Sequence, residues 1–196
     1  MATKTELINK ALTLIGAAPI VSITDSSNNA RIANRVYDSS LRSLLSECAW
    51  NFAVKRALLA TSSETLAWYH SGITIVYARP SDCIRIFGTN DVDATWYEEG
   101  DLIISDTSDL GIRYVQYLDT TSRFPSSFTE AFIDRLCADM AFAILNSAKI
   151  AQAYIEKYER VSLPKARSEN AQVGEQQFLQ DDAWELAKYN NSNTDA

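Results

Sequence analysis

The sequence predicts a mainly helical α+β fold: a helical bundle with a small inserted antiparallel β module and a projecting C-terminal segment. Apolar residues recur every three or four positions in residues 3–59 and 126–161, which is typical of amphipathic helices. Between residues 73 and 117 they alternate with other residues, as in half-buried strands. With 196 residues and 46% hydrophobic content, the chain is long enough for one sizeable core and a small second module.

Two helices are expected near the amino terminus. Residues 3–15 carry an apolar stripe that Gly16 is well placed to close, and Pro19 prevents the helix from resuming. The polar residues 22–29 can cap a second helix, which should span about residues 30–49.

The second helix has two different faces. One is apolar, includes Tyr37 and Leu41, and should pack into the core. The other is basic and should be solvated or contact a neighbouring subunit. Its cations are Arg31, Arg35 and Arg42.

The β module follows as a series of short alternating segments. The expected strands are residues 73–78, 83–87, 94–97, 102–104 and 112–117. Gly100 lies in the short connection between the third and fourth strands, which favours a hairpin there.

Helical periodicity returns after Pro125. Ser127 and Glu130 have the spacing of a capping box, and the helix that follows has both a large apolar face and a small-residue face. Such a helix should be central. Another helix continues to Val161, and Pro164 must kink or end it.

The C-terminal segment has large apolar side chains in an acidic, amide-rich setting. These side chains either fold back on their own domain or dock into a groove on another protein, and the break at Pro164 favours projection. The docking residues are Phe178, Leu179, Trp184, Leu186 and Tyr189. The expected domains are helical residues 1–68 and 119–177, an inserted β domain at 69–118, and a docking tail at 178–196.

The net charge of −7 is concentrated in the β module, because residues 86–112 contain no Lys or Arg. A surface of this kind repels a phosphate backbone, so tight or specific nucleic-acid binding is not expected. The acidic residues could hold calcium, act as an acid and base pair, or blunt exposed strand edges. We favour a solvated acidic face formed by Asp91, Asp93, Glu98, Glu99 and Asp101.

Motifs for catalysis and cofactor binding are absent from the sequence. There is no Gly-rich phosphate loop, nucleophile elbow or HExxH motif, so neither an enzyme nor a cofactor is predicted. Cys48, Cys83 and Cys137 are far apart and fit buried free thiols, and His70 fits a loop or strand edge. Without a membrane span or signal peptide, the chain should remain in the compartment where it is made.

An aromatic pair, Trp50 and Phe52, lies where the second helix should stop, and a turn or short helix is expected after it. Such a pair more often fills a core than stacks on a ligand, so we interpret it as a structural anchor. Arg56, beside it, pairs with an acidic residue either of its own chain or of a neighbour.

Short motifs follow one another in order along nearly the whole chain. The first are Ala11-Leu12-x-Leu14-Ile15-Gly16 and Trp50-Asn51-Phe52-Ala53-x-x-Arg56, and the later ones are Arg79-Pro80-x-Asp82 and Trp96-x-x-Glu99-Gly100. Their order resembles the tail tubular protein A or head-to-tail adaptor (connector) family of tailed bacteriophages, mainly short-tailed phages. Arg79 departs from this family's pattern, which has Leu at that position.

The resemblance implies a structural virion protein at the junction of head and tail, made in the host cytoplasm. It implies a homo-oligomeric ring, twelve-fold in the family, that joins the capsid portal protein to the tail nozzle protein. Subunits are expected to be monomeric before assembly, and DNA passes through the ring without specific binding. The C-terminal segment would reach the portal, and the acidic residues would face the lumen or the nozzle.

Two alternatives remain open. An adaptor with additional peptidoglycan-hydrolase activity would need an acid and a base, for which Glu98 or Glu99 with Asp101 are available. The chain could also be a non-viral helical scaffold protein.

Overall fold

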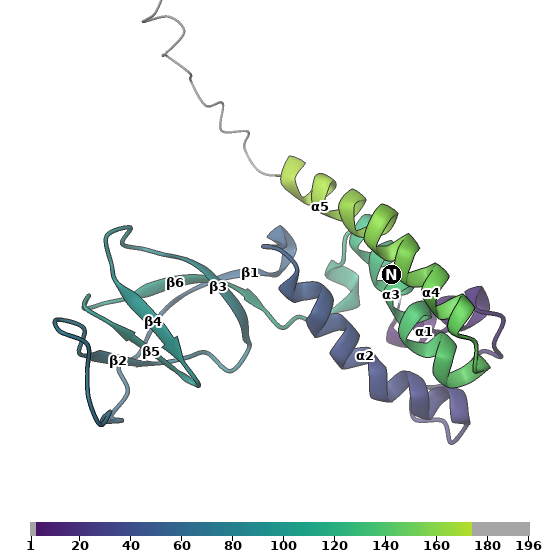
Figure 1. The fold of residues 1–196 in the computed structure, drawn as a ribbon, viewed down its shortest axis with the longest axis horizontal. Coiled ribbons are helices and arrows are strands. Elements are labelled where there is room, and N and C mark those ends of the chain that lie inside the picture. Colours follow the sequence, from purple (N-terminus) through teal and green to yellow (C-terminus); the bar gives the residue numbers. More distant parts are fainter. Residues whose placement is uncertain (1–2, 174–196) are drawn as a thin grey trace, which may run out of the picture.

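The computed structural model describes residues 3–173 and confirms the mixed α+β class. The helices lie on one side of the molecule and two small antiparallel sheets lie on the other (Figure 1). The helices are α1 (Lys4–Leu14), α2 (Asn28–Ser46), α3 (Ser126–Leu145), α4 (Ala148–Lys157) and α5 (Leu163–Gln172), with 3-10 turns η1 (Asn51–Ala53) and η2 (Thr121–Arg123) and a π-helical turn η3 (Tyr158–Ser162).

Both amino-terminal helices form where the sequence predicts them. Thr3 caps α1 through a reciprocal capping box with Glu6, and Gly16 ends it with a φ of 79°, which costs glycine little. Ser27 caps α2 by accepting a hydrogen bond from the amide of Ala30. That helix ends at Ser46, a few residues before the expected end.

Helix α3 is central, as its two apolar faces predict. It packs against α1, α2 and α4, and its buried residues include Phe128, Phe132 and Leu136. The expected capping box is wrong. The helix begins two residues earlier, with Pro125 at the cap position, so Ser127 is inside the first turn and buried.

The helix that contains Pro164 continues past it, where a kink or an end was expected. Helices α4 and α5 are joined through η3, in which the amide of Leu163 donates to the carbonyl of Tyr158. A π turn contains one extra residue, and Pro164 then falls at the start of α5, where its missing N–H is tolerated.

The β side contains two three-stranded sheets. The strands are β1 (Val54–Leu58), β2 (Ile75–Ala78), β3 (Cys83–Thr89), β4 (Trp96–Glu99), β5 (Leu102–Ser105) and β6 (Gly111–Gln116), ordered β1-β6-β3 and β2-β5-β4. The five expected strands and the β4–β5 hairpin are confirmed. The remaining strand, β1, follows η1 in the segment where only a turn or short helix was expected.

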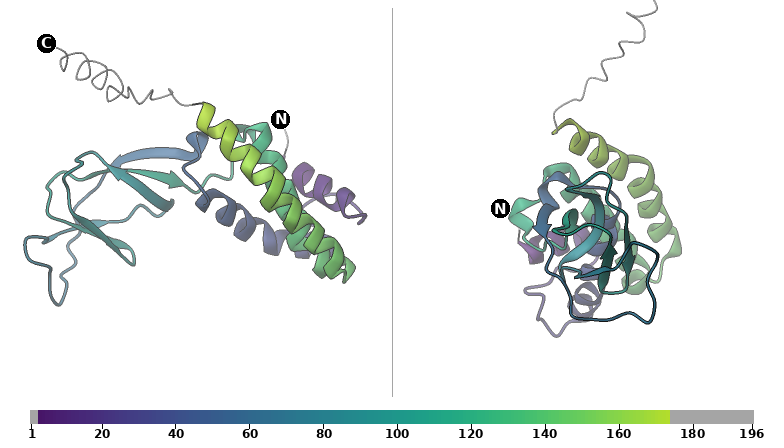
Figure 2. Two further views of the ribbon diagram at one scale, coloured as in Figure 1. Left: turned by 45° about the horizontal axis from the view of Figure 1, so that its top comes forward. Right: turned by 90° about the vertical axis from the view of Figure 1, so that its left-hand side faces the viewer.

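The pairing of β1 with β6 brings together the two chain segments that join the helical side to the β side. The strands are antiparallel, with Val54 opposite Val115 at the end nearest the helices. Val115 and Leu118 are buried in the same core as the helices. A second cluster, which includes Tyr77, Ile103 and Tyr114, fills the space between the two sheets. The left view of Figure 2 shows the β side projecting from the helical side.

Trp50 lies at the junction of the two sides and is 1% exposed. Its indole Nε1 donates to the carbonyl of Leu44 at 2.8 Å, which holds the end of α2. Its ring meets Phe128 edge-to-face at 4.9 Å, and Phe128 meets Phe52 at 4.7 Å. The interpretation of Trp50 and Phe52 as a structural anchor agrees with this packing.

We expect Trp50→Ala to lower the free energy of unfolding by about 3 to 5 kcal/mol, because it removes a large buried side chain and leaves a cavity. Urea unfolding followed by circular dichroism measures this. Trp68→Ala is the matched control, since Trp68 is 67% exposed, and it should change stability by no more than about 0.5 kcal/mol. Equal effects of the two substitutions would contradict the anchor role.

Candidate functional site

The acidic residues of the β module are divided between the two ends of one sheet. Glu99 and Asp101 flank Gly100 at the turn of the β4–β5 hairpin, where Gly100 has a φ of 59°. Asp91 and Asp93 lie in the loop before β4, which is the opposite end of that strand. The five predicted residues therefore do not form one continuous cluster.

Of these five carboxylates, only Glu98 forms an ion pair within residues 3–173. It accepts a hydrogen bond from Arg79 Nε at 2.5 Å, and the Arg79 amide donates to the carbonyl of Asp101 at 2.9 Å. Arg79 thus fixes the hairpin turn against the end of β2. The side chains of Glu99 and Asp101 remain exposed.

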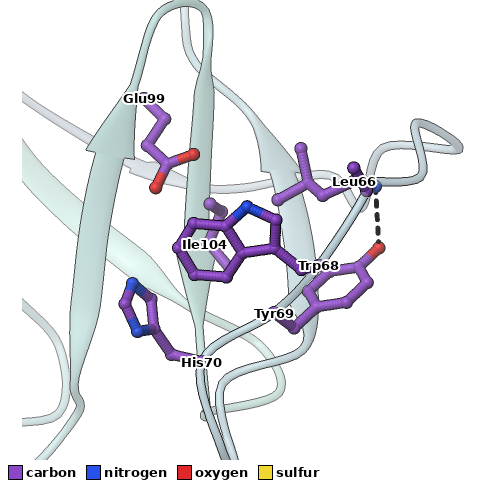
Figure 3. A pocket seen from close by; sticks show the side chains of 7 residues that line it. Leu66, Trp68, Tyr69, His70, Glu99 and Ile104 are labelled. Carbon is purple, nitrogen blue, oxygen red and sulfur yellow. Dashed lines mark hydrogen bonds between the residues drawn. The ribbon is translucent and has the colours of Figure 1, made fainter.

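A small cavity of about 130 Å³ lies beside this hairpin, and sequence analysis missed it. Residues 66–70 cross the outer face of sheet β2-β5-β4 and place Trp68 over Ile104, with Glu99 at one edge of the indole (Figure 3). His70 stands between Trp68 and Tyr97, with both ring centroids 5.0 Å away. His70 is an exposed loop residue, in agreement with its expected place.

The arginine face of α2 is partly used within the chain. Arg31 donates to the carbonyl of Ser26 through Nε and Nη2, at 3.1 and 2.8 Å. Arg42 lies over the ring of Tyr117 at 4.1 Å. Within the described part of the chain Arg35 makes no ion pair or hydrogen bond, so it is the arginine of this face most available to another molecule.

Arg56 lies on β1, exposed and directly opposite Arg113 of β6. No carboxylate among residues 3–173 pairs with it, which leaves a neighbouring chain or the undescribed residues as the source of a partner. Arg113 could not be identified from the sequence, because only the strand register brings it opposite Arg56.

An apolar groove of about 310 Å³ lies next to the anchor. Its lining includes Phe52, Phe128, Asn170 and Val173, the last described residue. Asn170 fixes α5 here, because its Oδ1 accepts from the Asn51 amide at 2.8 Å. The docking residues Phe178, Leu179, Trp184, Leu186 and Tyr189 lie outside the described residues.

The β1 edge is tied to the loop before β3 by a small polar network. Asp82 accepts hydrogen bonds from Lys55 Nζ at 2.8 Å and from the Tyr114 hydroxyl at 3.0 Å. Partial burial raises the pKa of Asp82, but the hydrogen bonds from Lys55 and Tyr114 and the charge of Lys55 together hold the pKa below its ordinary value. The hydrogen bond to Asp82 likewise raises the pKa of Lys55.

The residues present offer little for metal or thiol chemistry. No group of three or more His, Cys, Asp or Glu side chains in residues 3–173 is arranged to hold a metal ion. Cys48, Cys83 and Cys137 are free thiols, and burial raises the pKa of Cys137 to about 12. Such a thiol is unreactive. No helix in this part of the chain is long and apolar enough to cross a membrane.

No protein-family model matches the chain, and no curated protein is similar to it in sequence.

We expect Asp82→Asn to lower the free energy of unfolding by about 1 kcal/mol near neutral pH, because 33% of the Asp82 side chain is exposed and its hydrogen bonds are partly screened. The depressed pKa gives the sign of the pH dependence. The contribution of Asp82 is complete above its ordinary pKa of 3.8 and is lost as pH falls through the lower folded value.

Urea unfolding of both proteins over a range of acidic pH values measures this difference. Asp93→Asn is the control, because Asp93 is exposed and without an ion pair within residues 3–173. A difference that stays constant down to the most acidic condition would show that the Asp82 charge contributes nothing.

Proposed function

We propose that this chain is a head-to-tail adaptor of a tailed bacteriophage, a structural protein that forms a ring between the capsid portal and the tail nozzle. In this role it is a helical bundle with a β domain and a projecting C-terminal segment. It acts without a cofactor in the virion, and DNA passes through the assembled ring during ejection.

The observation that supports this proposal most is the way the β module is attached. Its two connecting segments run side by side as β1 and β6, and Trp50 anchors the first of them against α2 and α3. The residues of the resemblance therefore lie at structurally important positions, since Trp50, Phe52 and Asp82 all make contacts that hold the module in place.

The distribution of charge supports passage of DNA over binding. Residues 86–112 have no cation, and Asp93 and Asp109 are exposed carboxylates in loops of the β module. Carboxylates that face a channel repel phosphates and so keep the duplex from adhering to the wall. The lumen or the nozzle side of the ring is the position we assign to them.

The experiment that tests the function is native mass spectrometry of the purified chain with and without the portal protein of the same virus. The chain alone should be mainly monomeric, and addition of portal should produce a complex with many copies of the chain per portal ring. A chain that never binds portal would refute the adaptor function.

The same measurement tests the docking tail. Deletion of residues 178–196 should leave the helical content and urea unfolding midpoint nearly unchanged while abolishing binding to portal, because the apolar side chains of that segment supply the contact. A matched control is substitution of Asn190, Asn191 and Asn193 by Ser within the intact tail, which should bind normally. Undiminished binding of the truncated chain would rule out the docking role.

A further inference from the structure

The pair of arginines on sheet β1-β6-β3 is an unusual arrangement. Arg56 and Arg113 are directly opposite each other on antiparallel strands, where like charges destabilise the pairing. The neighbouring residues Ala57, Ile112 and Tyr114 face the second sheet. Because side chains alternate between the faces of a strand, Arg56 and Arg113 lie on the outer face of the sheet.

This outer face contains an open groove of about 370 Å³ between the arginines and the loop after β3. Asn90 forms part of its wall and is held by Gly111, whose amide donates to Asn90 Oδ1 at 2.7 Å. A Cβ atom on Gly111 would lie 3.1 Å from Asn90 Cγ, so glycine permits this close approach. Leu58, at the groove edge, is 68% exposed.

Neither arginine of the groove has an acidic partner in the part of the chain that the structure describes. Arg113 lies over the ring of Phe87, with its guanidinium carbon 5.0 Å from the centroid, which restrains the side chain without neutralising it. Two adjacent guanidinium groups present a double fork of donors that suits two carboxylates. The groove is therefore suited to an acidic segment with some apolar surface.

The chain itself carries a segment of this kind at the β4–β5 turn. Glu99 and Asp101 flank a single glycine, both are exposed, and neither is in an ion pair within residues 3–173. Leu102 follows them directly and is only partly buried. This turn belongs to the sheet on the other side of the arginine face, so the two surfaces are distinct.

We propose that the arginine groove, with Arg56 and Arg113 at its centre, binds the Glu99-Gly100-Asp101 turn of a second copy of this chain. Each guanidinium pairs with one carboxylate, and Leu58 covers the apolar part of the turn. Since the two surfaces differ, the contact is head-to-tail and leaves one groove and one turn free for further copies. This inference rests on the proposed ring and assigns it a contact within the β modules.

The test uses reciprocal charge reversal and sedimentation velocity of the full chain in low salt. The wild type should self-associate at high concentration, and the association should weaken as salt screens the charges. Arg56→Glu/Arg113→Glu and Glu99→Lys/Asp101→Lys should each raise the dissociation constant about tenfold or more, because each leaves like charges facing one another. The chain with all four changes should recover self-association.

Mixing the two double variants gives a sharper outcome. The intact turn of the first fits the intact groove of the second, and the introduced lysines of the second face the introduced glutamates of the first, so the mixture should associate although neither variant associates alone. Lys149→Glu/Arg160→Glu is the control, because it makes the same charge change on exposed positions of the helical side and should associate like wild type. Arg56→Gln/Arg113→Gln provides a milder variant should the reversal disturb folding.

Several results would overturn the inference. They are a wild type that stays monomeric at every concentration, a Glu99→Lys/Asp101→Lys variant that associates like wild type, and a mixture that associates no more than either variant alone. The second result would point to a two-fold contact through Asp91 or Asp109 near the groove. Binding to portal is measured in a separate experiment. If the groove variants self-associate like wild type while the chain still binds portal, the groove contact is refuted and the adaptor function is not.

Discussion

The fold depends on one buried tryptophan at the point where the chain leaves the helices. Trp50 joins three elements, because its Nε1 holds the last turn of α2, its ring packs on Phe128 of α3, and its own backbone leads through η1 into β1. At this position a single side chain fixes both the end of a helix and the direction of a strand.

The adjacent pairing of β1 and β6 explains how a β module can be inserted into a helical protein without separating its two halves. The chain leaves and returns along neighbouring strands, so α2 and α3 still pack against each other. The module then has its own apolar cluster, and it meets the helical core through Val115 and Leu118 with Ile84, Phe87 and Tyr117 packed beside them. Its outer surfaces are consequently free to carry charges that serve contacts with other molecules.

Periodicity predicted the helices up to α4 and five of the strands, because each of these elements has an apolar pattern complete within itself. Strand β1 was missed because its pairing partner, β6, is distant in the sequence and its own residues Val54–Leu58 include two cations. The same reason applies to the arginine pair and to the cavity beside Trp68, which exist only through strand register and loop packing. Four of the five acidic residues are exposed and Asp91 is partly buried, but their proximity in the sequence concealed their separation to opposite ends of β4.

The π turn at Tyr158–Ser162 has a consequence for the whole C-terminal helix. A π turn contains one residue more than an α-helical turn. The extra residue rotates the side chains of the following helix by about 100° around the helix axis. Ile150 and Tyr154 before the turn, and Leu163 and Ala166 after it, can therefore both face the helical core although no single α-helical phase would place them there. The π turn thus restores the buried side of the helix after Pro164. It also places Asn170 where its side chain bonds to the backbone of Ala49 and Asn51, on either side of Trp50.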